Sequence, residues 1–245
     1  MAGDPFLRWI EALEARQRRD LSFAEIRRGL QAVSSLYVER RKKLPGGAVF
    51  EGNGKRAAFA LYYGALHFLM LREIVRALPE AARAVGYVLD LGCGTGAAGA
   101  AWALQAGARC DGVERSGWAA AEARFTLSAL GLAGHITRGD LAASELPGVG
   151  AGILLAYALN ELDAATRSRL KVRLLEAHGR GARVLIVEPL ARAVAPWWDA
   201  WARELSGARC DQWRLRAELP ESVRLLGRAA GLDPRELTAR SLWLS

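Results

Sequence analysis

The sequence contains few cysteines. Only three occur in 245 residues, at positions 93, 110 and 210, and no two of them are spaced as zinc ligands or as part of a disulfide framework. We therefore expect no metal site and no small fold held by disulfides. A reducing cytoplasm is the compartment that fits this composition best.

A long uninterrupted apolar run is also missing. No apolar stretch approaches the roughly 18 residues that a membrane-spanning helix needs. The first residues include Asp4, Arg8, Glu11 and Glu14, where a signal peptide would have its apolar segment. The sequence therefore predicts no membrane partner and no cleaved leader.

Positive charge is abundant and unevenly distributed. The net charge is +8, and its excess is concentrated in residues 1–60. Such a surface could bind the phosphates of a nucleic acid. Alternatively, it is a solvated helix face in an arginine-rich chain, offset in part by neighbouring glutamates. The basic residues concerned are Arg16, Arg18, Arg19, Arg27, Arg28 and the run at positions 40–43.

The most informative segment is VLDLGCGTG, residues 88–96. A short apolar, β-branched run predicts a buried strand that stops at a glycine-rich turn, where the backbone can approach a ligand closely. The glycines fit the dinucleotide fingerprint in two frames, so a nicotinamide or flavin enzyme stays open. Asp90 argues for another ligand, because its carboxylate would repel a pyrophosphate and attract an ammonium and a sulfonium.

Residues 88–96 resemble the first motif of the class I S-adenosylmethionine-dependent methyltransferases, hydrophobic-hydrophobic-Asp-hydrophobic-Gly-x-Gly-x-Gly, at every position. The resemblance implies that Glu114 holds the ribose hydroxyls and that Asp140 receives the adenine amino group. It also implies that the apolar strand 152–157 ends beside the methyl acceptor. These four matches span roughly residues 86–190 and imply methyltransferase activity with S-adenosyl-L-methionine as the cofactor.

The resemblance places the cofactor in the glycine turn and at the ends of the following strands. Cys93, within the turn, is expected to be a small buried filler without chemistry of its own. The cofactor-binding residues expected are Asp90, Gly92, Cys93, Gly94, Gly96, Glu114, Arg115, Asp140, Leu141 and Tyr157.

Methyl transfer asks the protein mainly to align the acceptor with the methyl group and to exclude water. An oxygen or ammonium acceptor must also lose a proton. Tyr157, Asn160 and Glu161 are the catalytic candidates: a stacking ring, an acceptor for a target amine, and a base. Alternatively, Asn160 and Glu161 cap the following helix. The stretch departs from the Asn-Pro-Pro-Tyr pattern of amine-directed methyltransferases, so the acceptor is left open between RNA and a small molecule.

Aromatic residues elsewhere have two interpretations. His67 and Tyr63 share a helical face, where they form either a packed core pair, which we favour, or part of a lid over the cofactor. Trp197, Trp198 and Trp201 face one side of a helix, and this pattern is more typical of a core than of an aromatic substrate pocket.

Periodicity and punctuation predict an α/β fold. Helices are expected at 5–19, from Ser22 onward, at 56–78, 97–106, 116–130, 163–178, 188 onward and 221–230, and 50–55 is expected to be a loop. Ser22 and Glu25 form a capping box, and Ser116 and Asp163 are expected to cap their helices. The helix from Ser22 carries an apolar stripe at Phe23, Ile26, Leu30, Val33 and Tyr37. Strands are expected near 109–114, 134–138, 151–157, 182–188, 212–219 and 236–244. This alternation, with the resemblance, predicts a Rossmann-like class I methyltransferase fold with a mostly parallel, doubly wound sheet. Residues 1–80 would form an N-terminal helical extension or lid, and residues 81–245 the cofactor-binding domain.

A narrower resemblance supplies a second hypothesis. Residues 156–162 and 184–189 are similar to strand-end sequences in a methyltransferase-like family associated with assembly of the small ribosomal subunit. It implies a non-catalytic, RNA-binding assembly factor that keeps the fold and uses the basic N-terminal helices. The cysteine cluster of that family is missing here, so no iron-sulfur centre is expected. The oligomeric state is left open.

Overall fold

The computed structural model describes residues 3–39, 51–83, 85–205, 207–216, 218–232 and 236–245. Its centre is the predicted alternation of strands and helices. In chain order these are β1 (Tyr87–Leu91), α6 (Ala97–Ala106), β2 (Arg109–Glu114), α7 (Gly117–Ala129), β3 (Ile136–Arg138), β4 (Ala151–Ala156), α8 (Ala164–Gly179) and β5 (Arg183–Glu188). Asp163 caps α8 and Ser116 caps α7, as the sequence predicts.

The strands form one sheet in the order β3-β2-β1-β4-β5-β7-β6. The pairs among the first five strands are parallel. The last strand, β7 (Leu237–Leu244), is antiparallel both to β5 and to the edge strand β6 (Arg209–Leu215). This insertion departs from the 3-2-1-4-5-6 order of dinucleotide-binding sheets, while the reversal of strand order between β1 and β4 is kept.

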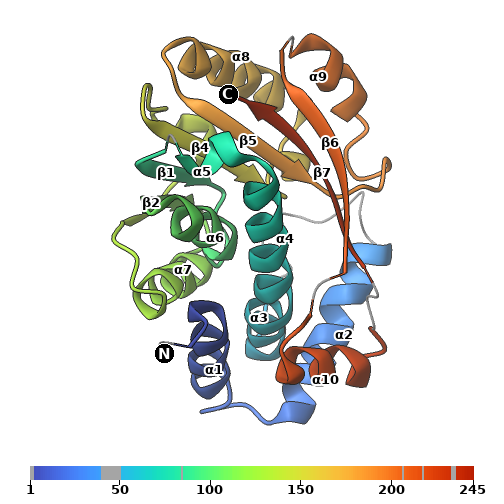
Figure 1. Ribbon diagram of the computed structural model, residues 1–245. Coiled ribbons are helices and arrows are strands. Elements are labelled where there is room, and N and C mark those ends of the chain that lie inside the picture. Colours follow the sequence, from blue (N-terminus) through green and yellow to red (C-terminus); the bar gives the residue numbers. More distant parts are fainter. Residues whose placement is uncertain (1–2, 40–50, 84, 206, 217, 233–235) are drawn as a thin grey trace.

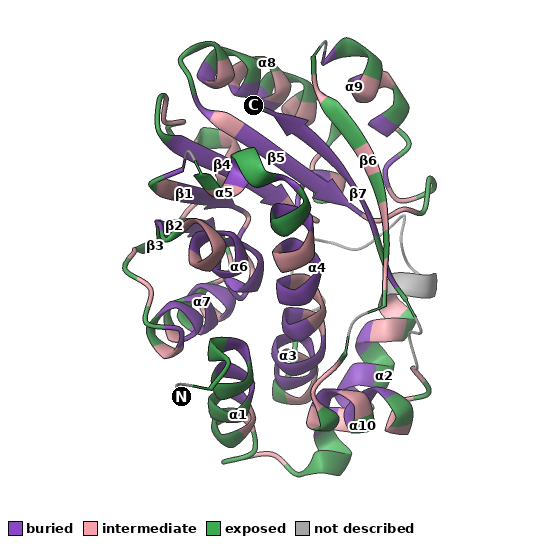
Figure 2. Ribbon diagram, in the orientation of Figure 1, coloured by how far each residue is buried: buried purple, intermediate pink, exposed green. Residues whose placement is uncertain are grey.

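Helices cover both faces of the sheet, which explains why its central strands β1, β4 and β5 are mostly apolar. Figure 1 shows α4, α6 and α7 on one side and α8 and α9 (Trp198–Glu204) on the other. The central strands are almost entirely buried (Figure 2). Trp198 and Trp201 belong to the core on the α8 side, at 3% and 4% exposure. The prediction that the tryptophan cluster is part of the core is therefore confirmed for Trp198 and Trp201, while Trp197 is partly buried and packs against them.

The N-terminal helices pack on the α6–α7 side of the molecule. Asp4 caps α1 (Pro5–Gln17). The buried carboxylate of Glu122 on α7 anchors this helix, because it accepts hydrogen bonds from Arg16 and Gln17. Part of the predicted cationic surface is thus neutralised within the protein, and Arg18 is likewise paired with Glu14.

The helix that follows, α2 (Phe23–Glu39), begins at the predicted capping box, in which the backbone N–H of Ser22 donates to Glu25 and that of Glu25 to the Ser22 hydroxyl. The predicted apolar stripe is correct at Ile26, Leu30 and Val33, which are buried. Phe23, the first residue of the helix, is 41% exposed instead. The side chain of Tyr37 and the basic run 40–43 lie outside the described residues.

The third predicted helix is longer and less regular than the sequence indicates. It begins at Asn53, where Gly52 with φ +86° turns the chain into the helix, so the predicted loop is shorter by three residues. It then runs through α3 (Asn53–Ala58), a π-helical turn at Phe59–Tyr63 and α4 (Gly64–Ala77), followed by the short α5 (Pro79–Arg83). The wider π turn rotates the aromatic residues that follow it relative to a regular helix.

By length and composition alone, the helical stretch Asn53–Ala77 could cross a membrane, and it is the one such helix in the described part of the chain. In the structure, 72% of its most apolar window is buried inside the protein. Its apolar character is therefore accounted for by packing: α4 lies against α6, and both contribute to the larger core cluster. The division of the chain near residue 80 stays a prediction.

The predicted C-terminal elements need two corrections. No helix begins at residue 188: residues 189–197 run through turns, and α9 begins at Trp198. Pro196 explains the delay, because proline lacks an N–H and fits only at the start of a helix. Strand β6 also begins three residues earlier than predicted, since its pairing with β7 starts at Arg209 opposite Trp243. Helix α10 (Glu221–Ala229) and β7 lie where predicted.

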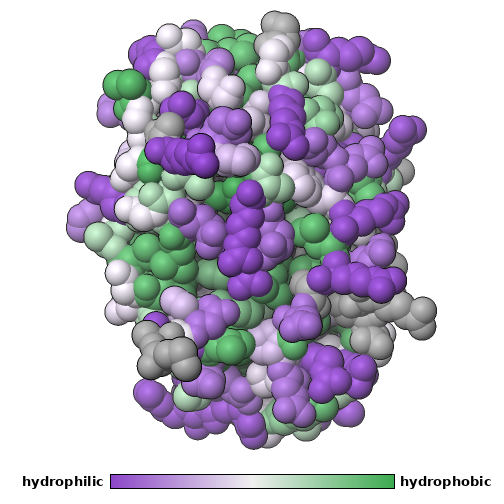
Figure 3. Space-filling view, viewed as in Figure 1, coloured by the Kyte–Doolittle hydropathy of each residue, from purple (hydrophilic) through white to green (hydrophobic). Residues whose placement is uncertain are grey.

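Hydrophilic side chains predominate on the face shown in Figure 3, with hydrophobic side chains showing between them. The large exposed apolar residues of the described chain are spread over several elements, such as Leu7 on α1, Val172 on α8 and Leu225 on α10.

Close packing of α6 on β1 predicts that Gly99→Ala destabilises the fold. A Cβ at this position would lie 2.6 Å from the Asp90 carboxylate and 2.9 Å from the Cys110 sulfur. We expect a loss of roughly 1–3 kcal/mol in the free energy of unfolding, measured by urea denaturation, because such overpacking forces a backbone shift. Gly179→Ala is the control, since nothing lies within 4 Å of its Cβ position. Equal stability of the two variants would contradict the packing described.

Candidate functional site

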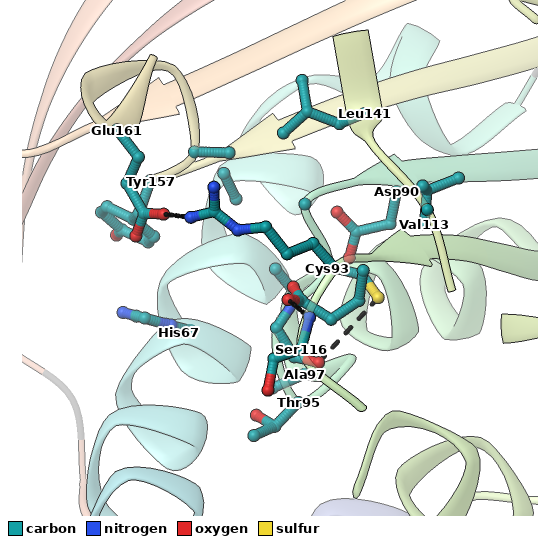
Figure 4. A pocket seen from close by; sticks show the side chains of 18 of the residues that line it. His67, Asp90, Cys93, Thr95, Ala97, Val113, Ser116, Leu141, Tyr157 and Glu161 are labelled. Carbon is teal, nitrogen blue, oxygen red and sulfur yellow. Dashed lines mark hydrogen bonds and ion pairs between the residues drawn. The ribbon is translucent and has the colours of Figure 1, made fainter. Parts of the chain in front are cut away.

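A pocket of about 390 Å³ opens at the carboxyl ends of β1, β2 and β4, and this volume is typical of small-ligand sites. It lies where the strand order reverses, the position at which open α/β sheets bind ligands. Figure 4 shows Asp90, Val113 and Leu141 at one end of the pocket and His67, Tyr157 and Glu161 at the other. Most of the predicted site residues line this pocket. They are Asp90, Gly92, Cys93, Gly94, Glu114, Arg115, Asp140, Leu141, Tyr157 and Glu161.

The glycine turn after β1 forms the floor of the pocket. The N–H groups of Gly92 and Cys93 both donate to the carbonyl of Val113 on β2, which folds the turn back over the sheet. Gly92 has φ +74°, and a Cβ there would lie 2.9 Å from Ala158 and 3.0 Å from Leu141. A side chain at Gly92 would therefore close the gap between the two ends of the pocket.

Two other glycines have different roles. Gly94 has φ +53° and would find nothing within 4 Å of a Cβ, so it faces the open pocket. Gly96 was predicted to bind the cofactor, but it is not among the pocket residues. It is the left-handed N-cap of α6, and a Cβ there would lie 3.0 Å from Ala123 of α7. The absence of a side chain at Gly96 lets α6 and α7 pack closely against each other.

Asp90 is a buried carboxylate with one unused oxygen. The side chain is 1% exposed; its Oδ2 accepts a hydrogen bond of 2.9 Å from the N–H of Gly99, whereas Oδ1 has no partner. Burial raises the pKa of Asp90 to about 7, against the Gly99 hydrogen bond and with a contribution from Glu114. A buried, unpaired carboxylate oxygen is costly unless a ligand satisfies it.

Glu114 is the last residue of β2, Asp140 lies just after β3, and the two carboxylates complete an acidic wall. Glu114 is fixed by two backbone groups, accepting from Ser116 N at 2.7 Å and from Gly94 N at 3.0 Å. Asp140 accepts from Ala142 N at 2.9 Å and so caps a short 3₁₀ turn. Three carboxylates therefore meet one pocket from three successive strand ends, a charge distribution that favours a cationic ligand.

Cys93 acts as the predicted filler. Its sulfur would lie 2.7 Å from a Cβ at Gly112, so the side chain packs directly onto the backbone of β2. Burial raises the pKa of the Cys93 thiol, as do the nearby carboxylates of Asp90 and Glu114. A thiol held protonated in this way is a poor nucleophile.

Tyr157 has a strained backbone at the end of β4. It is the one non-glycine residue with positive φ in the described chain, at +60°. The carbonyl of Val187 accepts its N–H at 2.8 Å, and the Asn160 side chain donates to its carbonyl at 3.2 Å. A left-handed tyrosine costs roughly 1–2 kcal/mol, so the surrounding bonds must impose it.

Asn160 does not line the pocket, in contrast to its predicted contact with the acceptor. Its Nδ2 is turned toward β5, where it donates to Glu188 at 2.7 Å. Glu188 is fully buried and also accepts from Leu159 N at 3.0 Å, and its pKa is raised to about 7 by burial. Asn160 and Glu188 together hold the turn that orients Tyr157.

Glu161 lies at the pocket mouth, where it is paired with Arg115 at 3.5 Å (Figure 4). Although 60% of its side chain is accessible, the pocket walls limit its hydration and raise its pKa. The pair joins the residue after β2 to the turn after β4, and so bridges the two sides of the opening.

His67 is a pocket residue that sequence reasoning assigned to a core pair. Its ring stacks on Tyr157 at 4.3 Å between centroids and 21° between planes, with Phe59 at 6.2 Å. Burial lowers the pKa of His67 to about 4, so the imidazole is neutral at physiological pH. The Tyr63–His67 spacing was the available signal in the sequence, but the stacking partner of His67 is Tyr157, which lies 90 residues further along the chain.

Within the described residues, no group of three or more His, Cys, Asp or Glu side chains is placed to hold a metal ion. The three cysteines are free, with Cys93 and Cys110 buried and Cys210 exposed.

The hydrogen bonds from the Asn160 side chain to Tyr157 and Glu188 predict that Asn160→Ala destabilises the protein. The change removes two hydrogen bonds and leaves a buried oxygen of Glu188 without its donor, which costs about 1–3 kcal/mol. Urea denaturation measures the loss. The control is Gln105→Ala, which removes an exposed hydrogen bond to Arg76 and should change stability by less than about 0.5 kcal/mol. If Asn160→Ala is as stable as this control, the stabilising role of the Asn160 hydrogen bonds is refuted.

No protein-family model and no curated protein sequence matches the chain. Solved structures do match. A bacterial protein called CtHen1-CN has a methyltransferase domain that superposes with a TM-score of 0.50 at 15% identity, covering 74% of this chain and 100% of that one. The corresponding domain of bacterial CtHen1-C gives 0.50 and 15%, over 73% and 98%. Magnesium protoporphyrin IX methyltransferase from Synechocystis, solved with bound SAH, gives 0.46 and 18%, over 73% and 82%.

The two matches at a TM-score of 0.50 are both to methyltransferase domains. The narrower resemblance to small-subunit assembly proteins stays a prediction. From the seven-stranded sheet with its antiparallel β7, and from the similarity to two methyltransferase domains, the chain has the Rossmann-like class I methyltransferase fold.

Proposed function

We propose that the protein is a methyltransferase that uses S-adenosyl-L-methionine. The observation that carries the proposal is the unpaired Oδ1 of Asp90, buried in the wall of an acid-lined pocket beside the glycine turn. A cofactor with an ammonium and a sulfonium satisfies this oxygen and the surrounding negative charge. Bound there, it supplies an electrophilic methyl group.

The residues present fit this cofactor along the whole pocket. Asp90 and the turn at Gly92 and Gly94 would receive its amino-acid part, because the unpaired oxygen and the open glycine lie together there. Glu114, fixed by two backbone groups, would accept the ribose hydroxyls. Asp140 and Leu141 would border the adenine, and Cys93 and Arg115 would complete the walls.

A nicotinamide or flavin dinucleotide fits less well. Its pyrophosphate would lie at the turn beside the three carboxylates, with Arg115 already paired to Glu161, and this arrangement repels an anion. The antiparallel β7 beside β5 also differs from the dinucleotide-binding sheet.

Tyr157 and Glu161 line the end of the pocket where a methyl acceptor, RNA or a small molecule, would bind. In this proposal Tyr157 contacts the acceptor and Glu161 controls access through its ion pair with Arg115. Asn160 is a positioning residue, since it acts on Tyr157 through the backbone.

We expect S-adenosyl-L-methionine to bind to the purified protein in isothermal titration calorimetry, with NAD showing no binding. Asp90→Asn keeps the shape of the side chain but removes its charge, so we expect roughly tenfold to hundredfold weaker binding. Glu73→Gln is the matched control, because this carboxylate lies on α4 and pairs with Arg72 and Arg76 outside the pocket. Binding of NAD instead, or equal affinity of both variants, would overturn the proposed function.

The raised pKa of Asp90 also predicts a pH dependence of cofactor binding. Without ligand its pKa is about 7, and a cation beside it favours the ionised form. Below about pH 7, binding must therefore release a proton, so affinity falls by up to about tenfold per pH unit and is flat above that value. Calorimetry in two buffers of different ionisation enthalpy measures the released proton. Asp90→Asn should abolish the release; its persistence in this variant would assign it to another group.

A further inference from the structure

Two backbone irregularities meet at the acceptor end of the pocket. One is the left-handed Tyr157 after β4, and the other is the π-helical turn Phe59–Tyr63 that precedes α4. They lie far apart in the sequence, yet each contributes a ring to the same wall, because Phe59, His67 and Tyr157 all line the pocket. Strained backbone and π turns both occur preferentially at functional sites.

The rings form a continuous aromatic surface. His67 and Tyr157 are stacked at 4.3 Å, and Phe59 meets the edge of His67 at 6.2 Å with an interplanar angle of 78°. Phe59 is 7% exposed, which fixes it as a support, while His67 and Tyr157 are partly accessible from the pocket. A planar ring that extends this stack would gain aromatic contact at little entropic cost.

The imidazole of His67 adds a specific polar function to this surface. In the described protein its interactions are ring contacts with Phe59, Tyr63 and Tyr157, and neither ring nitrogen has a hydrogen-bond partner there. It is neutral, because burial lowers its pKa to about 4. A neutral imidazole offers one N–H donor and one lone pair to a ligand.

The charges around the pocket select against a charged acceptor group. The carboxylates of Asp140 and Glu161 line the same pocket and disfavour a phosphate or carboxylate. A cationic amine would be repelled by the neighbouring sulfonium of the proposed cofactor, and it lacks the lone pair that methyl transfer requires.

We propose that the aromatic end formed by Phe59, His67 and Tyr157 is the acceptor subsite, and that it binds a planar, uncharged ring whose O–H or N–H faces His67. The inference rests on the proposed function. In the transfer, the acceptor lone pair forms the new bond to the methyl carbon while the methyl–sulfur bond breaks and leaves its electron pair on sulfur. His67 takes the proton of the acceptor and then passes it to water. Uptake of the proton by His67 becomes easier once the positive charge on sulfur is gone.

The test uses the full chain loaded with S-adenosylhomocysteine. The probes are 7-hydroxycoumarin and its methyl ether 7-methoxycoumarin, followed by fluorescence, with phenol and adenine as displacing ligands and cyclohexanol as a non-planar control. We expect 7-hydroxycoumarin to bind more tightly than its methyl ether, with displacement by phenol or adenine and none by cyclohexanol. His67→Phe keeps a ring but no nitrogen, so the preference for the hydroxyl should disappear. Tyr157→Ala should weaken both coumarins by roughly tenfold or more.

The controls separate this inference from the proposed function. Glu73→Gln should bind the probes as the unaltered protein does, and both Glu73→Gln and His67→Phe should bind S-adenosylhomocysteine within about twofold of it. If S-adenosylhomocysteine does not bind, the proposed function fails. If it binds but none of the planar probes binds at millimolar concentration, or if His67→Phe keeps the hydroxyl preference, the acceptor subsite is refuted.

A short single-stranded RNA, added as a competitor, identifies the source of the ring. Displacement of 7-hydroxycoumarin by the RNA, weakened in Tyr157→Ala, supports an exposed base as the acceptor. Binding of the coumarin unaffected by RNA supports a free small molecule. Both outcomes agree with a planar acceptor and differ only in what carries it.

Discussion

The pocket depends on the close approach of α6 to the end of β1. This approach is possible because Gly99 has no side chain, so its N–H reaches the buried carboxylate of Asp90. With α6 held there, the turn between the two elements must pass over β2, where Val113 receives two of its N–H groups. The free oxygen of Asp90, the open face of Gly94 and the fixed carboxylate of Glu114 all follow from that one contact.

Local sequence accounted for most of this arrangement. The strand, the glycine turn and the acids at positions 90, 114 and 140 could be predicted because each lies within a short pattern whose geometry is determined by neighbouring residues. The helix caps at Ser22, Ser116 and Asp163 were predictable for the same reason. These features required no knowledge of which distant segments meet.

The errors share a different cause. The π turn, the exposure of Phe23 and the inward turn of Asn160 toward Glu188 are decided by packing between segments far apart in the chain. The contact of His67 with Tyr157 is of the same kind. A helical face shows that a side chain will be covered, but not by which partner. The cofactor half of the pocket was therefore easier to predict than the half that would receive the acceptor.

The antiparallel β7 has a consequence for the order in which the sheet assembles. Strand β6 precedes β7 in the chain, yet its only neighbour in the described sheet is β7, which separates it from β5. An emerging β6 therefore has no edge to join until the later strand has docked. From Cys210 to Leu215 exposed and partly covered residues alternate, and the charged Arg209 and Arg214 are among the exposed ones. This pattern suits a strand that stays solvated until its neighbour has formed, because exposed charges discourage pairing with other chains.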